Sequence, residues 1–500
     1  MNLILNPEYI FIILLVAPTI GGAVSLIPRR GAEALSSLLS AIITVSVSII
    51  LLTLGISGSF GYFYSDGLTR IMCITISSIY LTSVAYSFFY IKRVKEPFLR
   101  FRWYYCLLNL FAFTMLLAVT INNLGFIWIA VEATTVTSAL LVALERERTS
   151  IEAAWRYTLI VSAGLVISLL SVIFVYSSQG TLIFSDLVGQ HLKNSTIMSI
   201  AVALALVGFG TKAGIAPMHA WLPDAHSEAP SPISAMFSAV LLPTSLYAFV
   251  RMFGLLQGTS AFEEIRNLAI GFGIFTALLA SIIMGHQKNY KRMLAYSSME
   301  NMGIILVGFA LGDIAAMGAV IQIIAHAFAK SSAFYEAGNI LVAYNTKNMH
   351  EVQGVVRKLR ITGYLFTVSC FSVTGAPPFG VFLGEFLILS QALRSGNFIV
   401  AILLAVVYIY AFIGLNRQSI QMIFGHSSFA KNKGADSLTL PSISRSTSGR
   451  IESKSEISSE IHNESWISVM IPLVNLAISL IIGIYMFPVI LQASTGMLSK

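Results

Sequence analysis

The sequence predicts an all-α polytopic membrane protein with about fourteen transmembrane helices. Of its 500 residues, 56% are hydrophobic and only 11% are charged, whereas a soluble chain is about one quarter charged. Apolar runs of about 20 residues recur from end to end, and each can cross a hydrocarbon core of about 30 Å as a helix. These runs are too long and too continuous to be the alternating strands of a β-barrel.

Polar loops divide the chain into the predicted spans. We place them at 8–28, 34–55, 68–91, 104–120, 124–144, 154–177, 196–224, 231–252, 267–285, 292–311, 315–343, 363–393, 397–418 and 466–490. Because no basic residue precedes the first apolar run, we expect a first span there and no cleaved signal peptide.

Two of these spans, 196–224 and 363–393, are over-long and are interrupted by Gly and Pro. Interrupted helices are tolerated in a membrane only within protein or beside a water-filled cavity. Their corresponding positions predict two inverted five-helix repeats, each with a broken helix. The predicted units are an N-terminal three-helix segment, the first repeat, the second repeat, a flexible cytoplasmic linker and a C-terminal transmembrane helix, at 1–103, 104–252, 267–418, 419–465 and 466–500.

Basic residues gather in alternate loops, which predicts the orientation of the chain. Most of the 31 Lys and Arg lie in the loops that are cytoplasmic if the N-terminus is outside, as the positive-inside rule requires. This distribution explains the net charge of +8 without nucleic acid as a partner. We expect a multi-pass protein of the cell membrane.

Four ionisable residues lie deep in predicted spans: Glu132, Lys212, Lys330 and Glu385. Each charge near the bilayer centre costs at least about 3 kcal/mol, so four without a function would be expensive. One interpretation is structural, with each residue paired or neutral and joining helices. Since the charges recur in both predicted repeats, we favour a proton relay.

A Lys–Glu pair that opens and closes would act as a proton switch. Burial favours the neutral form of a lysine, and a nearby carboxylate favours the charged form. We therefore expect Glu132 to be the partner of Lys212 and the charge of Lys212 to be moved during function.

Further polar residues accompany these four. Gln322 and His326 precede Lys330 at intervals of four, which predicts one polar stripe on a helix face. His219 and His226 follow the break after Lys212 and either join the relay or hydrogen-bond unwound backbone.

Glu300 leaves two interpretations open. It lies within the predicted span 292–311 and belongs either to the relay or to helix packing, as a carboxylate that faces Arg292 or Lys291.

Several motifs resemble a known family. TKAGIAPMHAWLPDAHSEAPSPISA, AYSSMENMG, HAFAKSSAF and GAPPFGVFLGEF are similar to segments of the antiporter-like subunits of respiratory complex I and membrane-bound hydrogenases, and the resemblance covers roughly residues 100–420. VEATTVTSALLVALERERTSIEAAWRY most resembles the hydrogenase component F branch.

The resemblance implies proton translocation along a hydrated mid-membrane axis. Glu132 matches the family's fifth-helix glutamate and Lys212 its seventh-helix lysine. His326 and Lys330 match the eleventh-helix relay, and Glu385 matches the terminal position on the twelfth helix. Redox chemistry in partner subunits of a dehydrogenase or a hydrogenase would drive the movement. The expected partners are other membrane subunits and a peripheral redox arm, and we expect no catalytic centre in this chain.

The eighth span departs from the family pattern. Many members have a lysine or histidine there, but AMFSAVLLPTSLYAF offers only Pro243 and hydroxyl groups. Water, or Ser238 and Thr244, would have to bridge the two halves.

Three other interpretations compete with this one. A subunit of a multi-subunit Na⁺/H⁺ antiporter would share the fold. A haem or quinone protein would need paired axial ligands, and of the eight histidines we expect only His219, His226 and His326 to be in the membrane. A passive scaffold would tolerate neutralised charges. With three scattered cysteines and no C-x-x-C or P-loop motif, we expect no metal or other cofactor.

Overall fold

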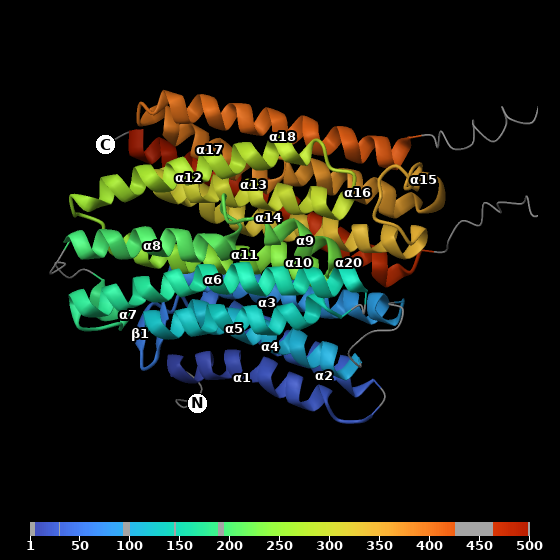
Figure 1. Cartoon of the computed structure of the whole chain (residues 1–500), viewed down its shortest axis with the longest axis horizontal. Helices are drawn as coiled ribbons and strands as arrows, with labels where there is room; N and C mark the ends of the chain where they lie inside the picture. Colours follow the sequence, from blue (N-terminus) through green and yellow to red (C-terminus); the bar gives the residue numbers. More distant parts are fainter. Residues whose placement is uncertain are drawn as a thin grey trace, which may run out of the picture.

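The chain forms a bundle of long helices that run side by side (Figure 1). The computed structural model describes residues 6–29, 31–93, 101–144, 147–188, 195–425 and 464–498. A short antiparallel hairpin of β1 (Gly58–Phe60) and β2 (Phe63–Ser65) connects the second and third helices.

The helices follow the predicted spans closely. In chain order they are α1 (Pro7–Ser25), α2 (Ala32–Thr53), α3 (Gly67–Tyr90), η1 (Ile91–Arg93), α4 (Phe101–Thr120), α5 (Leu124–Val142), α6 (Arg148–Gln179), α7 (Phe184–Leu187), α8 (Ser195–Ala213), α9 (Trp221–Glu228), α10 (Ser231–Met236), η2 (Phe237–Leu241), α11 (Leu242–Gly254), α12 (Ala261–Met284), α13 (Tyr290–Leu311), α14 (Asp313–Tyr344), α15 (Val355–Lys358), α16 (Arg360–Val373), α17 (Gly380–Arg394), α18 (Phe398–Phe424) and α20 (Trp466–Leu498).

The predicted all-α membrane architecture is confirmed. Within the described part of the chain, thirteen helices are long and apolar enough to cross a membrane. The predicted span 363–393 is not among them because it consists of two shorter helices, α16 and α17.

Both predicted helix breaks are present. Residues 214–220 separate α8 from α9, and residues 374–379 separate α16 from α17. Gly214 and Gly375 have φ angles of +79° and +68°, a region that residues with a Cβ rarely occupy. The breaks also contain the cis peptide bonds Ala216–Pro217 and Pro377–Pro378.

The eighth span contains a feature that the sequence did not predict. Between α10 and α11, residues Phe237–Leu241 form the π-helical segment η2. Pro243 lies two residues after this segment and has no N–H to donate to the carbonyl four residues earlier, which favours a wider turn at this point.

The linker begins later than predicted. We expected it from residue 419, but α18 remains helical to Phe424. The apolar residues Met422 and Ile423 are buried there, so tertiary packing extends the helix beyond the apolar run. The predicted linker residues 426–463 lie outside the described part of the chain.

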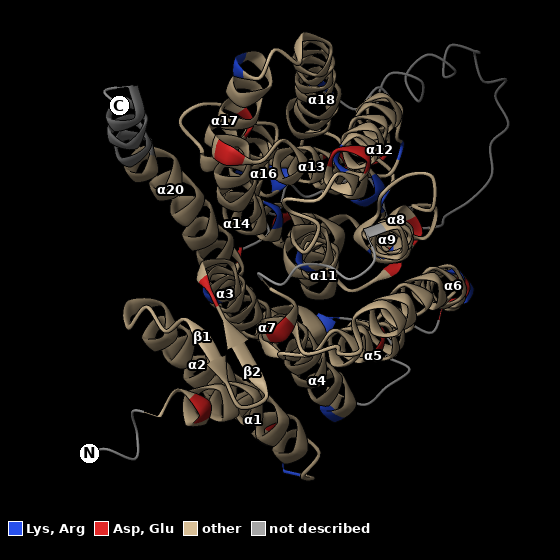
Figure 2. Ribbon diagram, turned by 90° about the vertical axis from the view of Figure 1, so that its left-hand side faces the viewer, with Lys and Arg blue, Asp and Glu red and all other residues tan. Residues whose placement is uncertain are grey.

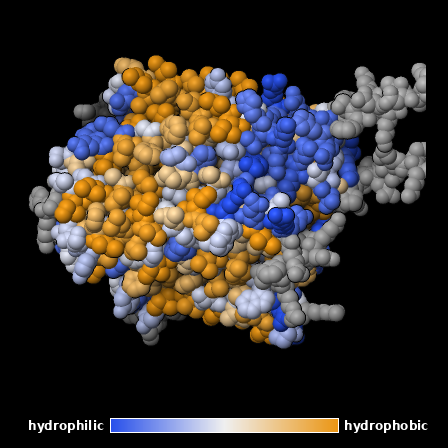
Figure 3. Space-filling view, viewed as in Figure 1, coloured by the Kyte–Doolittle hydropathy of each residue, from blue (hydrophilic) through white to orange (hydrophobic). Residues whose placement is uncertain are grey.

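The surface has the distribution expected of a protein surrounded by lipid. Large apolar side chains such as Ile399 and Val166 are exposed along the helices. Hydrophobic residues cover most of the middle in Figure 3, and strongly hydrophilic residues gather at the end that carries α15 and the end of α18. We call this the basic-loop end. Viewed from the side in Figure 2, charged residues on the helices are sparse.

Candidate functional site

A set of ionisable side chains lies inside the bundle, away from its apolar surface. Its fully or almost fully buried members are Lys212, His226, Glu300, His326, Lys330 and Glu385. They come from α8, α9, α13, α14 and α17, so elements from both predicted repeats contribute. Glu132 on α5 is half-buried, and His219 lies in the break between α8 and α9.

Lys212 contacts α5 at the turn that carries Glu132, but the two side chains do not form a direct ion pair. Lys212 Nζ donates to the carbonyl of Val131 (3.1 Å) and to the hydroxyl of Thr135. The ion pairs among the described residues do not include Glu132 with Lys212, although the two interact electrostatically.

A side chain of α6 binds the carboxylate of Glu132. Ser162 Oγ donates to Glu132 Oε1 (2.8 Å), while Oε2 is buried without a hydrogen-bond partner in the described structure. The described structure therefore does not contain the expected direct pair, and a hydroxyl group binds each of the two side chains separately.

Aromatic rings border Lys212 on the side of the eighth span. The ammonium of Lys212 lies 5.7 Å from the ring centroid of Tyr157. Tyr157 packs against Trp221 and against Phe237 at centroid distances of 4.7 and 5.8 Å. Its hydroxyl is 2.7 Å from Ser138 Oγ. Tyr157 is therefore a polar group at this border that the sequence did not single out.

The two histidines after the break differ in environment. His226 is fully buried, and its ring packs between Phe237 and Phe334 at 5.6 and 5.3 Å. Neither ring nitrogen has a hydrogen-bond partner in the described structure. His219 is half-buried, with Nδ1 likewise unpartnered. His219 hydrogen-bonds the backbone of Pro217 within the break, which agrees with one of the two interpretations that the sequence left open.

Hydroxyl groups connect the eighth span to Lys330. Ser238 Oγ in η2 lies 2.6 Å from Ser298 Oγ on α13. Ser298 donates to the carbonyl of Leu294 (3.0 Å), and Lys330 Nζ donates to the same oxygen (2.7 Å). Ser238 therefore links the eighth span to the carbonyl that Lys330 also contacts. Among the described residues, the hydroxyl of Thr244 donates to the carbonyl of Val240 on its own helix.

The predicted polar stripe on α14 extends onto α13. Gln322 Nε2 donates to Asn301 Oδ1 (3.0 Å), and Asn301 Nδ2 donates to Glu300 Oε2 (2.7 Å). His326 lies between Gln322 and Lys330 on the helix, fully buried, with both ring nitrogens unpartnered in the described structure. Asn301 was missed because an amide inside an apolar span carries no charge signal.

Glu300 does not face either basic residue that the packing interpretation named. Arg292 pairs with Asp224 at 2.9 Å, and Lys291 Nζ donates to the carbonyl of Ala229 (2.5 Å). Glu300 interacts electrostatically with Lys330 and with Glu385. The carboxylate therefore interacts with both of the residues predicted to end the relay.

Glu385 lies against the break in the twelfth span. A Cβ on Gly375 would clash with its carboxylate oxygens, so the absence of a side chain at Gly375 makes room for the carboxylate. The hydroxyl of Tyr408 donates to the backbone carbonyl of Glu385 (3.3 Å). Only 6% of Glu385 is exposed.

Comparison with known proteins decides the family. The model for the membrane domain of NADH:quinone oxidoreductases and Mrp antiporters matches residues 121–430, more than half of the chain. The chain belongs to this family. It is 31% identical to a hydrogenase-4 component F homolog of Methylacidiphilum infernorum over 380 residues, which cover 73% of this chain and 79% of that protein.

Two further relatives widen the comparison. A Na⁺/H⁺ antiporter protein of Bacillus subtilis is 29% identical over 290 residues, covering 57% of this chain and 58% of its own. A chain of the membrane-bound sulfane sulfur reductase, an archaeal respiratory complex, superposes with a TM-score of 0.82 at 20% identity, covering 96% and 94% of the two chains. The chain is thus an antiporter-like membrane subunit with the fold of subunits found in respiratory complexes.

Proposed function

We propose that this chain translocates protons across the membrane as a subunit of an oxidoreductase complex, driven by redox chemistry in partner subunits. The observation that carries the proposal is the connection across the eighth span. Ser238, Ser298 and the Leu294 carbonyl link the middle of the bundle to Lys330 without a solvent-exposed group between them. Such a connection is expected where charge or protons pass between the two predicted repeats.

The electrostatic neighbours support an order for the relay. Glu132 interacts with Lys212, Lys330 with His326 and Glu300, and Glu300 with Glu385. Each step joins groups from different helices or different turns. A proton gained by one group therefore changes the proton affinity of the next.

Matching helix starts support two inverted repeats. α5 begins after Asn123 and α13 after Asn289, and each asparagine accepts N–H bonds from the second and third residues after it. Glu132 and Glu300 follow on these two helices. In the proposed topology the two helices run in opposite directions across the membrane, so Glu300 would be the counterpart of Glu132 in the second repeat.

The orientation follows from charge. We propose that the N-terminus is outside and that the basic-loop end is cytoplasmic in the cell membrane. Other membrane subunits would cover part of the apolar surface, and a peripheral redox arm would supply the driving force.

The test uses the complete complex in sealed vesicles. Lys212→Ala and Lys330→Ala should each abolish proton translocation while the complex assembles, because each removes a charge buried in a different half. Assembly is checked by co-purification of the other subunits. Normal translocation in both variants would overturn the proposal.

A second candidate is sodium–proton antiport, which the similarity to the Bacillus subtilis antiporter protein favours. The same vesicles separate the two functions. Proton translocation that persists unchanged without sodium supports the first, whereas a strict requirement for sodium, with sodium moving in the opposite direction, supports the second.

A further inference from the structure

Glu336 is a buried carboxylate outside the relay described above. It lies on α14, beyond Lys330 in the direction of the basic-loop end, and is fully buried. Its Oε1 accepts hydrogen bonds from Ser332 Oγ (3.0 Å) and Ser369 Oγ (3.1 Å). Its Oε2 has no hydrogen-bond partner among the described residues.

No basic group in the described structure compensates for an ionised Glu336. The ion pairs found there do not include it. A buried carboxylate without a cation costs several kcal/mol when it is charged. The unpartnered Oε2 is therefore a place where a proton can be held and from which it can be passed on.

Further polar groups lie beyond Glu336 toward the basic-loop end. Asn339 lies one helical turn further along α14; its Oδ1 accepts from Tyr86 Oη (2.9 Å), and its Nδ2 donates to the Ser468 carbonyl (2.8 Å). The hydroxyl of Tyr86 also donates to the backbone carbonyl of Tyr335 (2.8 Å). These groups continue the polar path from the carboxylate toward the helix end.

A small cavity begins where this path ends. It has a volume of about 20 Å³, and its lining includes the buried Asn339 and Thr362 and the more exposed Arg93 and Glu464. This volume is sufficient for one water molecule, which needs two or more polar partners. The carboxylate of Glu464 accepts the N–H groups of Ile361 and Thr362 at the start of α16, at 3.0 and 2.9 Å. Glu464, which lines the cavity, therefore binds the backbone at the start of α16.

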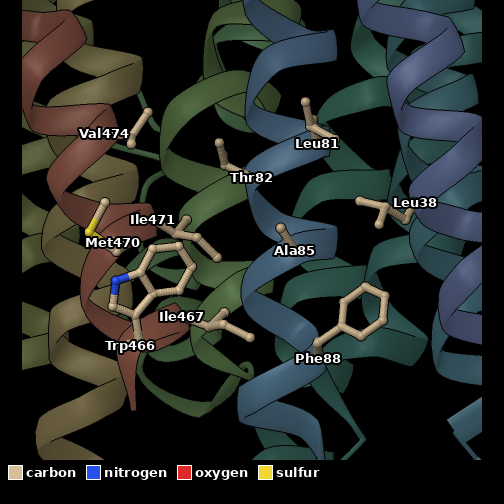
Figure 4. A pocket seen from close by; sticks show the side chains of 10 residues that line it. All are labelled: Leu38, Leu81, Thr82, Ala85, Phe88, Trp466, Ile467, Met470, Ile471 and Val474. Carbon is tan, nitrogen blue, oxygen red and sulfur yellow. The ribbon is translucent and has the colours of Figure 1, made fainter. Parts of the chain in front are cut away.

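The larger groove nearby is a poor route for protons. It lies between α3 and α20, has a volume of about 470 Å³ and is lined mostly by apolar side chains such as Phe88 and Ile471 (Figure 4). Thr82, which also lines it, lies 3.1 Å from the hydroxyl of Tyr335. Apolar surfaces of this kind suit lipid chains and do not order water.

Cys370 on α16 connects Glu336 to the relay. It is fully buried and interacts electrostatically with both Glu336 and Lys330. The titratable groups that interact with Glu336 are therefore Cys370 from α16 and Tyr86 from α3. Lys330, on the same helix as Glu336, interacts with Cys370. On the α20 side, the Pro472 carbonyl accepts from Ser332.

We propose that Glu336 takes up protons from the basic-loop end and delivers them to Lys330. This inference rests on the proposed function and adds an uptake branch to it. A proton from the solvent at the basic-loop end passes through water in the small cavity to the carboxylate of Glu336, so that the relaying water stays neutral. The resulting carboxylic acid then transfers its proton to the neutral amine of Lys330 through water beside Cys370, which regenerates the carboxylate and forms the ammonium group.

The experiment compares three variants of the full complex in vesicles. Glu336→Gln should slow proton uptake from the basic-loop side by about a hundredfold, the lower end of what one positioned proton-transfer group contributes. Glu336→Asp should restore part of the rate, because it retains the carboxyl group. Ser372→Ala is the matched control. Like Ser369, which binds Glu336, Ser372 is a buried serine of α16, but its hydroxyl contacts Ser479 of α20.

Infrared difference spectra provide a second readout. A carboxyl C=O band that changes during turnover in the native complex should be absent in Glu336→Gln and shifted in Glu336→Asp. Normal uptake in Glu336→Gln with lost translocation in Lys330→Ala would overturn this inference alone. Normal translocation in the Lys212→Ala and Lys330→Ala variants would instead overturn the proposed function.

Discussion

Lys330 and Ser298 donate hydrogen bonds to the same acceptor, the backbone carbonyl of Leu294, at 2.7 and 3.0 Å. This shared oxygen connects a buried ammonium on α14 with a hydroxyl on α13. Ser298 in turn lies 2.6 Å from Ser238 of the π-helical segment. Lys330 is thus linked, through the Leu294 carbonyl and Ser298, to the π-helical segment of the eighth span.

The first prediction concerns this bridge. Ser238→Ala should lower the rate of proton translocation by roughly tenfold or more, since it removes one hydroxyl from a proton path to which a positioned group contributes about 10²-fold. Stopped-flow measurement with a pH-sensitive dye in vesicles gives the rate.

Thr244→Val is the control for the bridge. Thr244 is equally buried, but within the described part of the chain its hydroxyl bonds only to the carbonyl of Val240 on its own helix. We expect its rate to stay near that of the native complex. Equal rates in Ser238→Ala and Thr244→Val would mean that the hydroxyl chain carries no protons.

The second prediction separates the charge of Lys212 from its volume. Both Lys212→Ala and Lys212→Met should abolish translocation, because both lose the ammonium that binds the Val131 carbonyl and the Thr135 hydroxyl. Lys212→Met retains most of the side-chain volume and avoids the cavity left by alanine. Lys288→Met, at an exposed lysine, is the control. Translocation in Lys212→Met comparable to that of the control would contradict a role for the charge.

Periodicity and composition were sufficient to predict the helices, because each span must satisfy its backbone hydrogen bonds within the membrane. The two breaks were predictable since Gly and Pro interrupt long apolar runs. The π-helical segment was not predictable, because Pro243 alone is equally compatible with a simple kink. Likewise α18 extends past its apolar run to Phe424 because neighbouring helices bury its last turn.

The charged site residues were predictable because a charge inside an apolar run is conspicuous, but their contacts were not. Lys212 and Glu132 were expected to pair directly, yet hydroxyl groups of Thr135 and Ser162 bind them separately. Those hydroxyls lie on neighbouring helix faces that only the packing determines. Glu336 was overlooked although its type and burial resemble those of the other carboxylates.

The third prediction concerns an ion pair at the start of α3. Asp66 accepts the Thr69 N–H as the cap of α3, and its carboxylate pairs with both terminal nitrogens of Arg251, at 2.5 and 2.7 Å. The guanidinium also lies 4.5 Å from the ring centroid of Tyr247. Burial alone would raise the pKa of the Asp66 carboxyl, but hydrogen bonds and charge from Arg251 hold it below its ordinary value.

Asp66→Asn should therefore lower the free energy of unfolding by about 3 kcal/mol at neutral pH, as expected when one partner leaves a buried pair. A carboxyl with a lowered folded pKa stabilises above its unfolded pKa of about 4, and this stabilisation is lost as the pH falls through the folded value. Thermal unfolding in detergent should thus show native and variant proteins converging at acidic pH. Glu263→Gln, in an exposed pair with Arg266, should change stability by less than about 1 kcal/mol.

The last prediction concerns the release of protons at Glu385. This carboxylate interacts with Glu300, which interacts with Lys330, so it ends the electrostatic series that begins at Lys330. Glu385→Gln should stop release on the side away from the basic-loop end while uptake at the basic-loop end continues for a single turnover. Glu385→Asp should retain part of the release, whereas Gly375→Ala should disturb it, because a Cβ there would clash with the carboxylate. Lost translocation together with slowed electron transfer in the whole complex would indicate tight coupling. Unchanged translocation in Glu385→Gln would mean that protons leave by another group, and the proposed direction of the relay would be wrong.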